Sequence, residues 1–397
     1  MRKLFYYIVM TNTTPLHIGN GDNTFTDLDV IKDKEAKFFI PGTTLAGCFL
    51  HSLNEENQKL FNPTVDENMT KQSPFFISDA LVEEESISYE TRDGIALDEN
   101  KITIDGNKYD YEIVPAGCHF RFRIEVFDRD ENVLYEKLVD QILASIDNQD
   151  IRLGYKTSRG LGAFKIERVG SKIFNKDNYN DYFNFDSHQL NNYDLYEFEA
   201  LASKYLNMKI SLKQQGGLSI RTYQTKKGEA DFIHIHSGNK PVIPGTSWNG
   251  LFRKQFNYYL KLLPQEIKIE DIFGANIDSE DKIKSNIYFK ESIIYDYEIL
   301  SMVRNKINRY DNSTIKGGLY KEESCYNGTT ELEITLNKRS LNSQQIEIIK
   351  KILLLVIKDL DQGFIALGGE TSIGRGLFKV EKVMIDDKCV CLEDEVC

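Results

Sequence analysis

An internal repeat constrains the fold of this chain more than any other feature. Residues 153–169 read LGYKTSRGLGAFKIERV, and residues 367–383 read LGGETSIGRGLFKVEKV. Ten of these 17 positions are identical without a gap, at an offset of 367 − 153 = 214 residues. Chance rarely produces such agreement, and repeats at a fixed order indicate a duplicated structural unit. We therefore expect two copies of one domain.

Two earlier landmarks also occur twice, in the same order. A strand-like segment runs into a Gly-containing turn at residues 5–21 and again at 208–221. An IPG-T-[TS] element then enters an apolar segment at residues 40–47 and 243–250. Because a hydroxyl can accept hydrogen bonds from the first turn of a helix, Thr43 and Thr246 are predicted to cap the helices that follow.

Weaker correspondences fill the interval between these landmarks. Residues 76–80 resemble 288–292, each a short strand ending in an acid, and residues 92–95 resemble 304–307, each opening a polar insertion. Apolar residues at helical spacing precede both glycine loops, and Ser343 is the expected cap of the second of these helices. The helical positions are Leu134, Leu138, Ile142 and Ile146 in one copy, and Ile346, Ile349, Leu353, Val356 and Leu360 in the other.

The repeat divides the chain into residues 1–170, an Asn-, Asp- and Tyr-rich linker at 171–200, and residues 201–397. Each copy mixes strands with two helices, which predicts an α+β fold of the ferredoxin-like (RRM-like) kind with long inserted loops. The longest aliphatic run, residues 352–357, is too short to cross a bilayer, and the apolar N-terminus is best explained as a first strand. A cytoplasmic protein with no membrane partner is expected.

The formal net charge of −12 argues against a protein that binds nucleic acid over its whole surface, although a local groove can still be basic. The six cysteines include no CxxC pair, so neither a zinc ribbon nor a redox motif is supported. Three of them lie in the C-terminal tail at Cys389, Cys391 and Cys397, for which a reduced tail is favoured over a soft-metal site.

The glycine loops are open to two interpretations. Glycines spaced by one residue expose backbone N–H groups that can hold phosphates, or they form a bulged turn before a strand. A P-loop is excluded because no GK[ST] follows at the required spacing, and a dinucleotide fingerprint is excluded because the glycines precede a strand.

Taken together, the IPG-[ST]-[ST] element, the strand ending in SDA and the T-S-x-G-x-G-x-F-K loop resemble the RAMP superfamily, the RNA-binding proteins of CRISPR systems. The resemblance covers nearly the whole chain, twice, and is closest to the backbone subunit of type III effector complexes in a fused two-copy form. It implies tandem RAMP domains with thumb-like insertions. It also implies guide RNA, complementary target RNA and other CRISPR effector subunits as partners.

The family cleaves target RNA with an aspartate in a loop that reads roughly D-x-P-[VI]-[VI]-[RK]-D. Residues 27–33, DLDVIKD, match this loop and place Asp27 on the catalytic position, although Asp29 replaces the proline. Asp231 is the counterpart in residues 231–237. Mg²⁺ or another divalent cation is the implied cofactor, and a carboxylate acting with it can activate or align the RNA 2′-hydroxyl.

The resemblance also suggests which residues contact RNA. The family's basic residue after the helix glycine is Arg253 in the second copy but Leu50 in the first. His234 and His236 alternate on one strand and are interpreted as surface residues or as phosphate contacts. The predicted RNA-binding residues are Lys156, Ser158, Arg159, Ser372, Arg375, Arg253, Arg92 and Arg304.

Three alternatives stay open. One is a structural guide-binding subunit without catalysis, favoured by the missing proline and by Leu50. Another is a guide-processing endonuclease that uses His17 as general base. The third is a duplicated ferredoxin-like scaffold that binds no RNA.

Overall fold

The computed structural model describes residues 2–21, 24–66, 69–70, 72–97, 103–128, 134–201, 204–223, 230–263, 267–275 and 283–392. The chain forms two compact units. The first unit contains Met1–Gly94, Tyr109–Thr157 and Leu161–Ser203, and the second contains Ile95–Lys108, Ser158–Gly160 and Lys204–Cys397. Within the described residues, no helix combines the length and the apolar character needed to cross a membrane.

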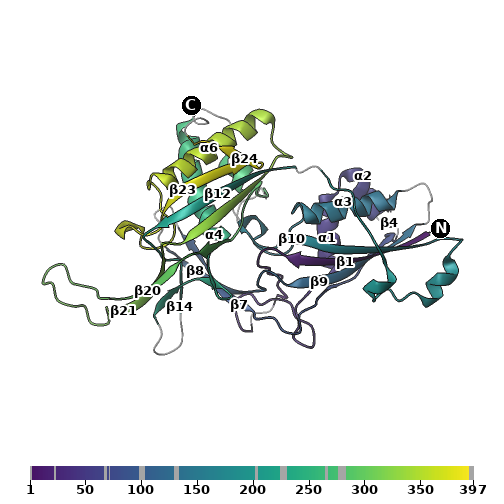
Figure 1. The fold of residues 1–397 in the computed structure, drawn as a ribbon, viewed down its shortest axis with the longest axis horizontal. Helices are drawn as coiled ribbons and strands as arrows, with labels where there is room; N and C mark the ends of the chain where they lie inside the picture. The colour runs from purple at the N-terminus through teal and green to yellow at the C-terminus, as the bar shows by residue number, and fades with distance from the viewer. Residues whose placement is uncertain are drawn as a thin grey trace. The chain divides into compact units, whose positions relative to one another are not determined.

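The first unit is built on an antiparallel sheet in which β10, β1 and β9 are neighbours in that order (Figure 1). β6 and β5 both pair with the other edge of β9. This is the strand order of a ferredoxin-like fold, in which helices follow the first and third strands. The main elements are β1 (Arg2–Asn12), α1 (Gly42–Ser52), β5 (Phe75–Ile77), β6 (Ala80–Val82), β9 (His119–Asp128), α3 (Tyr135–Asp147) and β10 (Phe164–Phe174). The smaller ones are β2 (Phe39–Ile40), α2 (Glu55–Phe61), β3 (Thr64–Asp66), β4 (Met69–Thr70) and β11 (Asp194–Leu195).

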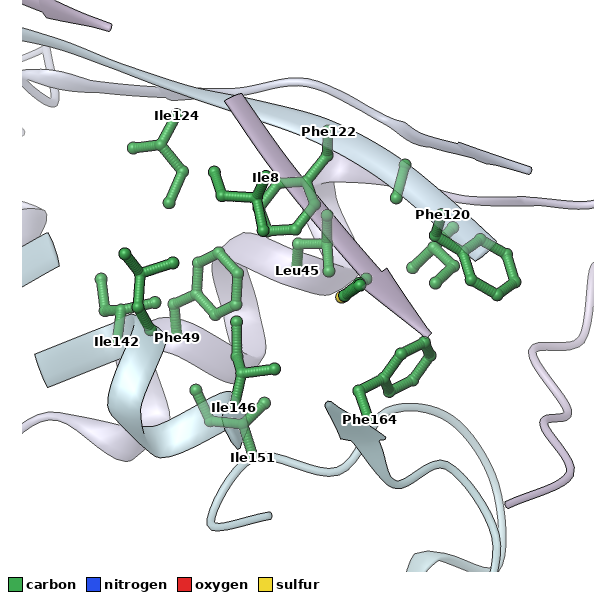
Figure 2. Packing of buried hydrophobic residues seen from close by; sticks show 14 of the residues in the cluster. Ile8, Leu45, Phe49, Phe120, Phe122, Ile124, Ile142, Ile146, Ile151 and Phe164 are labelled. Carbon is green, nitrogen blue, oxygen red and sulfur yellow. The ribbon is translucent and has the colours of Figure 1, made fainter. Parts of the chain in front are cut away.

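The core of the first unit lies between this sheet and the two helices. β9 alternates buried and exposed residues, as expected for a strand with one face on a core. Figure 2 shows Ile8 of β1 and Phe122 of β9 beside Leu45 and Phe49 of α1, and all four are buried. Burying side chains of this size stabilises the fold by roughly 1.5–3 kcal/mol each.

The segment expected to be a linker, residues 171–200, belongs to the first unit. Phe185 lies 5.2 Å from Phe5, and Tyr193 lies 5.5 Å from Tyr7, measured between ring centroids. These aromatic residues cover the face of β1 that points away from the helices, together with Phe174. Part of the Tyr- and Phe-rich composition therefore serves burial, which the linker interpretation did not recognise, whereas Tyr179 and Phe183 are exposed.

The second unit repeats the arrangement: β23, β12 and β22 are neighbours, and β18 and β19 both pair with β22. The main elements are β12 (Tyr205–Gln215), α4 (Gly245–Leu262), β18 (Ile287–Phe289), β19 (Ser292–Tyr295), β22 (Thr329–Asn337), α6 (Ser343–Asp361) and β23 (Leu377–Ile385). The smaller ones are β13 (Gly217–Leu218), β14 (Arg221–Tyr223), β15 (Phe232–His234), β16 (His236–Ser237), β17 (Lys240–Ile243), α5 (Ile269–Phe273) and β24 (Lys388–Val390).

The polar insertions form β-hairpins. In the second unit, β20 (Glu298–Arg304) pairs with β21 (Tyr320–Tyr326) in an antiparallel register from Glu298↔Tyr326 to Arg304↔Tyr320, and the hairpin extends from the sheet (Figure 1). In the first copy, β7 (Glu90–Leu97) and β8 (Thr103–Ile113) form the corresponding pair. The duplicated ferredoxin-like fold with thumb-like insertions is thus confirmed.

The predicted helix caps are wrong. Pro41 and Pro244 occupy the N-cap positions of α1 and α4, and neither makes a side-chain capping bond. Instead, the backbone N–H of Gly42 donates to Oδ1 of Asp79, the acid of the SDA segment, at 2.7 Å. α6 is capped by Asn342 through the backbone N–H of Gln345, so Ser343 is the first residue inside this helix.

Candidate nucleic-acid interface

The two glycine loops close in the same way. The backbone N–H of Leu153 donates to the carbonyl of Gly162 at 2.9 Å, and Leu367 donates to Gly376 at 2.9 Å. Both glycines have positive φ, 75° and 77°. A Cβ atom would lie 1.9 Å from the carbonyl oxygen of Leu153 at the first glycine, and 1.8 Å from that of Leu367 at the second. These glycines are therefore required by the backbone path itself.

Each loop also attaches to the turn that follows its first strand. Tyr155 donates its backbone N–H to the carbonyl of His17 at 2.9 Å, and Gly369 donates to Ser219 at 2.8 Å. The tips of the loops are short 3₁₀ turns, η1 (Thr157–Arg159) and η4 (Thr371–Ile373). Among the predicted contacts in these tips, Arg159 and Ser372 are exposed and Ser158 is half-buried.

Asp27 lies at the surface beside strand β8. Its backbone N–H donates to Oδ1 of Asp110 at 2.7 Å, and the N–H of Asp110 donates back to Oδ2 of Asp27 at 2.9 Å. The next residue, Leu28, forms a parallel bridge with Tyr111. The reciprocal bonds and the bridge fix the loop against the insertion, with the Asp27 carboxylate at the surface.

Asp231 occupies the equivalent place in the second unit. Its backbone N–H donates to the carbonyl of Lys321 at 2.8 Å, and the N–H of Lys321 donates to Oδ2 of Asp231 at 2.8 Å. Phe232 then forms a parallel bridge with Glu322. The geometry thus makes Asp27 and Asp231 structural counterparts, with one difference: a lysine stands where the first unit has Asp110.

Asp29, the departure from the family's proline, organises the Asp27 loop. Its carboxylate accepts from the backbone N–H groups of Thr24, Phe25 and Thr26 at 2.7, 3.0 and 2.8 Å, and from the Thr26 hydroxyl at 2.8 Å. Burial alone would raise the pKa of Asp29, but the bonds from Phe25 and Thr26 outweigh it and lower the pKa to about 2. The charged carboxylate is therefore part of the loop's framework.

The basic residues predicted in the first unit are engaged internally. The ammonium of Lys156 lies 3.7 Å from the ring centroid of Tyr111, 4.7 Å from that of Tyr109 and 5.4 Å from that of Tyr155. Such contacts attract a cation to the ring face. Arg92 is buried, with its guanidinium 3.6 Å from the Glu90 carboxylate.

Arg375 in the second loop is also buried, and it belongs to an ionic cluster that the sequence did not reveal. Its Nη1 forms ion pairs with Glu322 and with Glu370, the latter at 2.9 Å, and hydrogen-bonds the Ser324 hydroxyl at 2.5 Å. Nη2 of Arg221 reaches the same two carboxylates, at 2.8 Å and 2.6 Å.

Arg304, at the end of the β20–β21 ladder next to the connecting segment, completes the cluster at longer range. Its Nε lies 3.7 Å from Glu322, and its Nη2 lies 3.9 Å from Glu370. We name these five residues, Arg221, Arg304, Glu322, Glu370 and Arg375, the arginine–glutamate cluster.

The same place in the first unit is largely apolar. The two parallel bridges make Tyr111 the counterpart of Glu322, and the loop alignment makes Leu161 the counterpart of Arg375. Tyr111, Ile113 and Leu161 form a small buried cluster there. The sequence did contain one signal for the arginine–glutamate cluster. Within otherwise matching loops, Lys156 of the first copy is replaced by Glu370 in the second, and Leu161 is replaced by Arg375.

The remaining candidates are partly or fully buried. Arg253 is half-buried, burial lowers the pKa of its guanidinium, and its Nη1 donates to the Phe273 carbonyl at 3.5 Å. His234, expected at the surface, is fully buried: Nε2 donates to the Val242 carbonyl at 2.9 Å, and Nδ1 accepts from the Ile220 N–H. His17 is 3% exposed, and its Nδ1 lies 2.7 Å from the Glu112 carbonyl. A general base needs contact with its substrate, which this burial does not favour.

Over the described residues, no group of three or more His, Cys, Asp or Glu side chains is arranged to hold a metal ion. The pair Asp27 and Asp110 nevertheless supplies oxygen donors of the right kind for Mg²⁺, which is commonly held by one or two carboxylates together with substrate phosphates. The second unit offers Asp231 without a counterpart of Asp110.

Comparison with known proteins gives one family. The model of the RAMP superfamily matches residues 9–165 and 227–379, so both repeats are covered. No curated protein matches the chain.

Proposed function

Since the chain belongs to the RAMP superfamily, the RNA-binding proteins of CRISPR systems, we propose that it is a backbone subunit of a type III effector complex. In this role it binds guide RNA through both domains, and it cleaves complementary target RNA at Asp27. Its partners are guide RNA, target RNA and the neighbouring effector subunits. A cytoplasmic location is part of the proposal.

The observation that carries the cleavage proposal is the loop of the first unit. The Asp29 carboxylate accepts hydrogen bonds from three backbone N–H groups, and the reciprocal hydrogen bonds between Asp27 and Asp110 fix the loop to β8. A rigid loop with an exposed carboxylate suits catalysis, because a positioned group loses little entropy in the transition state.

The chemistry needs few protein groups, because RNA carries its own nucleophile in the 2′-hydroxyl. The Asp27 carboxylate would accept the hydroxyl proton or hold the hydroxyl in line with the phosphorus. Mg²⁺ held by Asp27 and Asp110 would supply positive charge for the developing phosphorane. Oδ2 of Asp27 already accepts from Asp110, so Oδ1 is the oxygen available for this work.

We propose that the second unit contributes less to cleavage. Lys321 occupies the place of Asp110, so a divalent cation would find only one carboxylate there. The alternative of a purely structural subunit is therefore retained for this unit, and it extends to the whole chain if Asp27 proves inactive.

The test uses the complex assembled with its guide, incubated with labelled complementary RNA and Mg²⁺. Asp27→Ala should abolish one discrete cut, with a loss of 100-fold or more, as is typical when a general acid–base group is removed. Asp231→Ala should change cutting little. Target binding, measured separately by gel shift, should be unchanged in both variants.

Asp110→Asn separates the two roles assigned to the first unit. It keeps the acceptor for the Asp27 N–H but removes a charge, so cutting should weaken and recover in part at higher Mg²⁺. Equal cutting by the wild type, Asp27→Ala and the double variant Asp27→Ala/Asp231→Ala would remove catalysis from these residues and leave the structural role.

A further inference from the structure

The arginine–glutamate cluster of the second unit has more positive than negative charge. Three guanidinium groups, Arg221, Arg304 and Arg375, surround the two carboxylates of Glu322 and Glu370. With every group ionised, the sum is one positive charge in a chain whose net charge is −12. Glu322 is fully buried and the Arg375 side chain is 4% exposed, so solvent screens this charge weakly.

The hydrogen-bond donors of the cluster also exceed its acceptors. A guanidinium group has five N–H donors. Nη2 of Arg375 is buried and has no hydrogen-bond partner among the described residues. Arg304 reaches the two carboxylates only at 3.7 and 3.9 Å, beyond hydrogen-bonding distance, so its donors remain available.

The surplus can be reached from solvent. The side chains of Arg221 and Arg304 are 30% and 29% exposed, whereas the two glutamates are far more buried. Nε of Arg221 also donates to the Ser219 hydroxyl at 3.3 Å, and its guanidinium lies 4.9 Å from the Phe232 ring centroid. The two arginines are therefore positioned by neighbouring groups while part of each side chain stays accessible to solvent. A planar guanidinium edge binds two oxygens of one phosphate in a bidentate manner.

We propose that the arginine–glutamate cluster is an anion site that binds one phosphodiester group of single-stranded RNA, mainly through Arg304 and Arg221. One phosphodiester carries one negative charge, which matches the excess charge of the cluster. The inference rests on the proposed RNA-binding function and assigns one contact of it to the end of the β20–β21 ladder that carries Arg304.

The first unit lacks this site. Gly19 stands in the place of Arg221, as their equivalent bridges to Val30 and His234 establish, and the Tyr111 and Leu161 side chains replace Glu322 and Arg375. Lys156, the counterpart of Glu370, lies over tyrosine rings, and Arg92, the counterpart of Arg304 in the sequence alignment, is buried beside Glu90. Among the described residues, this site is therefore found in the second unit and not at the equivalent place in the first.

The experiment measures the salt dependence of RNA binding by the full chain. A fluorescein-labelled single-stranded RNA is titrated at several NaCl concentrations, and the slope of log K against log[salt] is compared between proteins. Each phosphate contact contributes about 0.7 to this slope for single strands. Arg304→Ala should make the slope shallower by about 0.7, and Arg221→Ala should act in the same direction.

Two variants act as controls. Arg304→Lys retains the charge and should retain most of the slope. Arg168→Ala removes an exposed arginine of β10 outside the cluster and should leave the slope unchanged. Arg375→Ala is avoided because it would leave Glu322 buried without its closest cation, and thermal melting verifies that the chosen variants are folded.

A second arm distinguishes RNA from free anion. Inorganic phosphate at millimolar concentration should raise the melting temperature of the wild type and not that of Arg304→Ala. A wild-type slope in Arg304→Ala would overturn the inference while leaving RNA binding intact. If the wild type binds no RNA, the proposed function fails, and the phosphate arm alone then decides whether the anion site exists.

Discussion

At the scale of single residues, the structural equivalence of Asp27 and Asp231 could be predicted from the sequence, but the hydrogen bonds that support the Asp27 loop could not. The loop motif placed Asp27 at a catalytic position, and the equivalent bonds of Asp231 agree with that alignment. In the sequence, Asp29 stood out as a departure from the family's loop motif, because it replaces the proline. In the structure the Asp29 carboxylate accepts hydrogen bonds from three backbone N–H groups of a tight turn. This role depends on the backbone geometry of the turn, which residue spacing alone does not describe.

Asp29→Asn is therefore expected to loosen this loop. The amide keeps the size of the side chain but loses one acceptor oxygen and the charge, so the free energy of unfolding should fall by about 1–2 kcal/mol. Because the folded pKa of about 2 lies below the ordinary 3.8, this stabilisation is present above pH 3.8 and is lost as the pH falls towards 2. Urea unfolding of wild type and variant at pH 6 and pH 3 measures both effects.

The matched control is Asp33→Asn in the same loop. Asp33 accepts from the N–H groups of Glu35 and Lys37 at an exposed position, so its substitution should cost less. Target cutting should also decrease in Asp29→Asn, because Asp27 is held by the same loop. A variant as stable as the wild type at pH 6 would show that the four hydrogen bonds contribute nothing measurable.

At the scale of elements, order was easier to predict than boundaries. The repeat predicted the strand and helix order of both units because each landmark recurs with its neighbours. The caps were wrong because the group that accepts from the first N–H of α1 is the Asp79 carboxylate, which lies between β5 and β6, 37 residues away in sequence. The expected linker failed for a related reason: the sheet face that Phe185 and Tyr193 cover exists only after folding.

The glycine loops allow a sharp test at this scale. Gly376→Ala would place a Cβ atom 1.8 Å from the Leu367 carbonyl at a φ of 77°, whereas Gly374→Ala meets nothing within 4 Å at a φ of 83°. Both substitutions cost the strain of a positive φ, about 1 kcal/mol, but only the first adds a clash with backbone. Thermal melting should show a loss several times larger for Gly376→Ala.

The comparison tests whether folding requires the close approach of Gly376 to the Leu367 carbonyl. Equal losses in the two variants would mean that the loop backbone shifts freely, and that the close approach to Leu367 is not needed for folding. A large loss in Gly376→Ala alone would show that this glycine is retained for packing of the backbone, whether or not the loop also contacts phosphate.

At the scale of the whole molecule, the two copies share a fold and differ in what they bury. Each unit has its own hydrophobic core, and equivalent positions carry Tyr111 and Leu161 in one and Glu322 and Arg375 in the other. The net charge of −12 concealed this difference, because a total says nothing about where charges gather. The two copies thus share a backbone pattern but differ in the side chains buried beneath their glycine loops, which are apolar in the first unit and ionic in the second.

A single tryptophan makes the second unit separately observable. Trp248 is fully buried in the core of this unit, so its fluorescence reports the unfolding of this unit alone. The same unit contains His234, whose pKa is lowered to about 4 mainly by burial. Below pH 6.5 the His234 side chain binds a proton in the unfolded chain but stays neutral in the folded unit. The free energy of unfolding therefore falls as the pH decreases from 6.5 towards 4.

Urea titrations followed by Trp248 fluorescence should therefore give a free energy of unfolding that decreases between pH 6 and 5, with a slope that approaches the one-proton limit of about 1.4 kcal/mol per pH unit. In His234→Gln the amide can still donate to the Val242 carbonyl and accept from the Ile220 N–H, but it does not titrate. Its tryptophan-detected stability should be lower at pH 7 and nearly flat over this range. A variant with the full wild-type slope would assign the pH dependence to other groups, because a glutamine cannot take up the proton that the slope records.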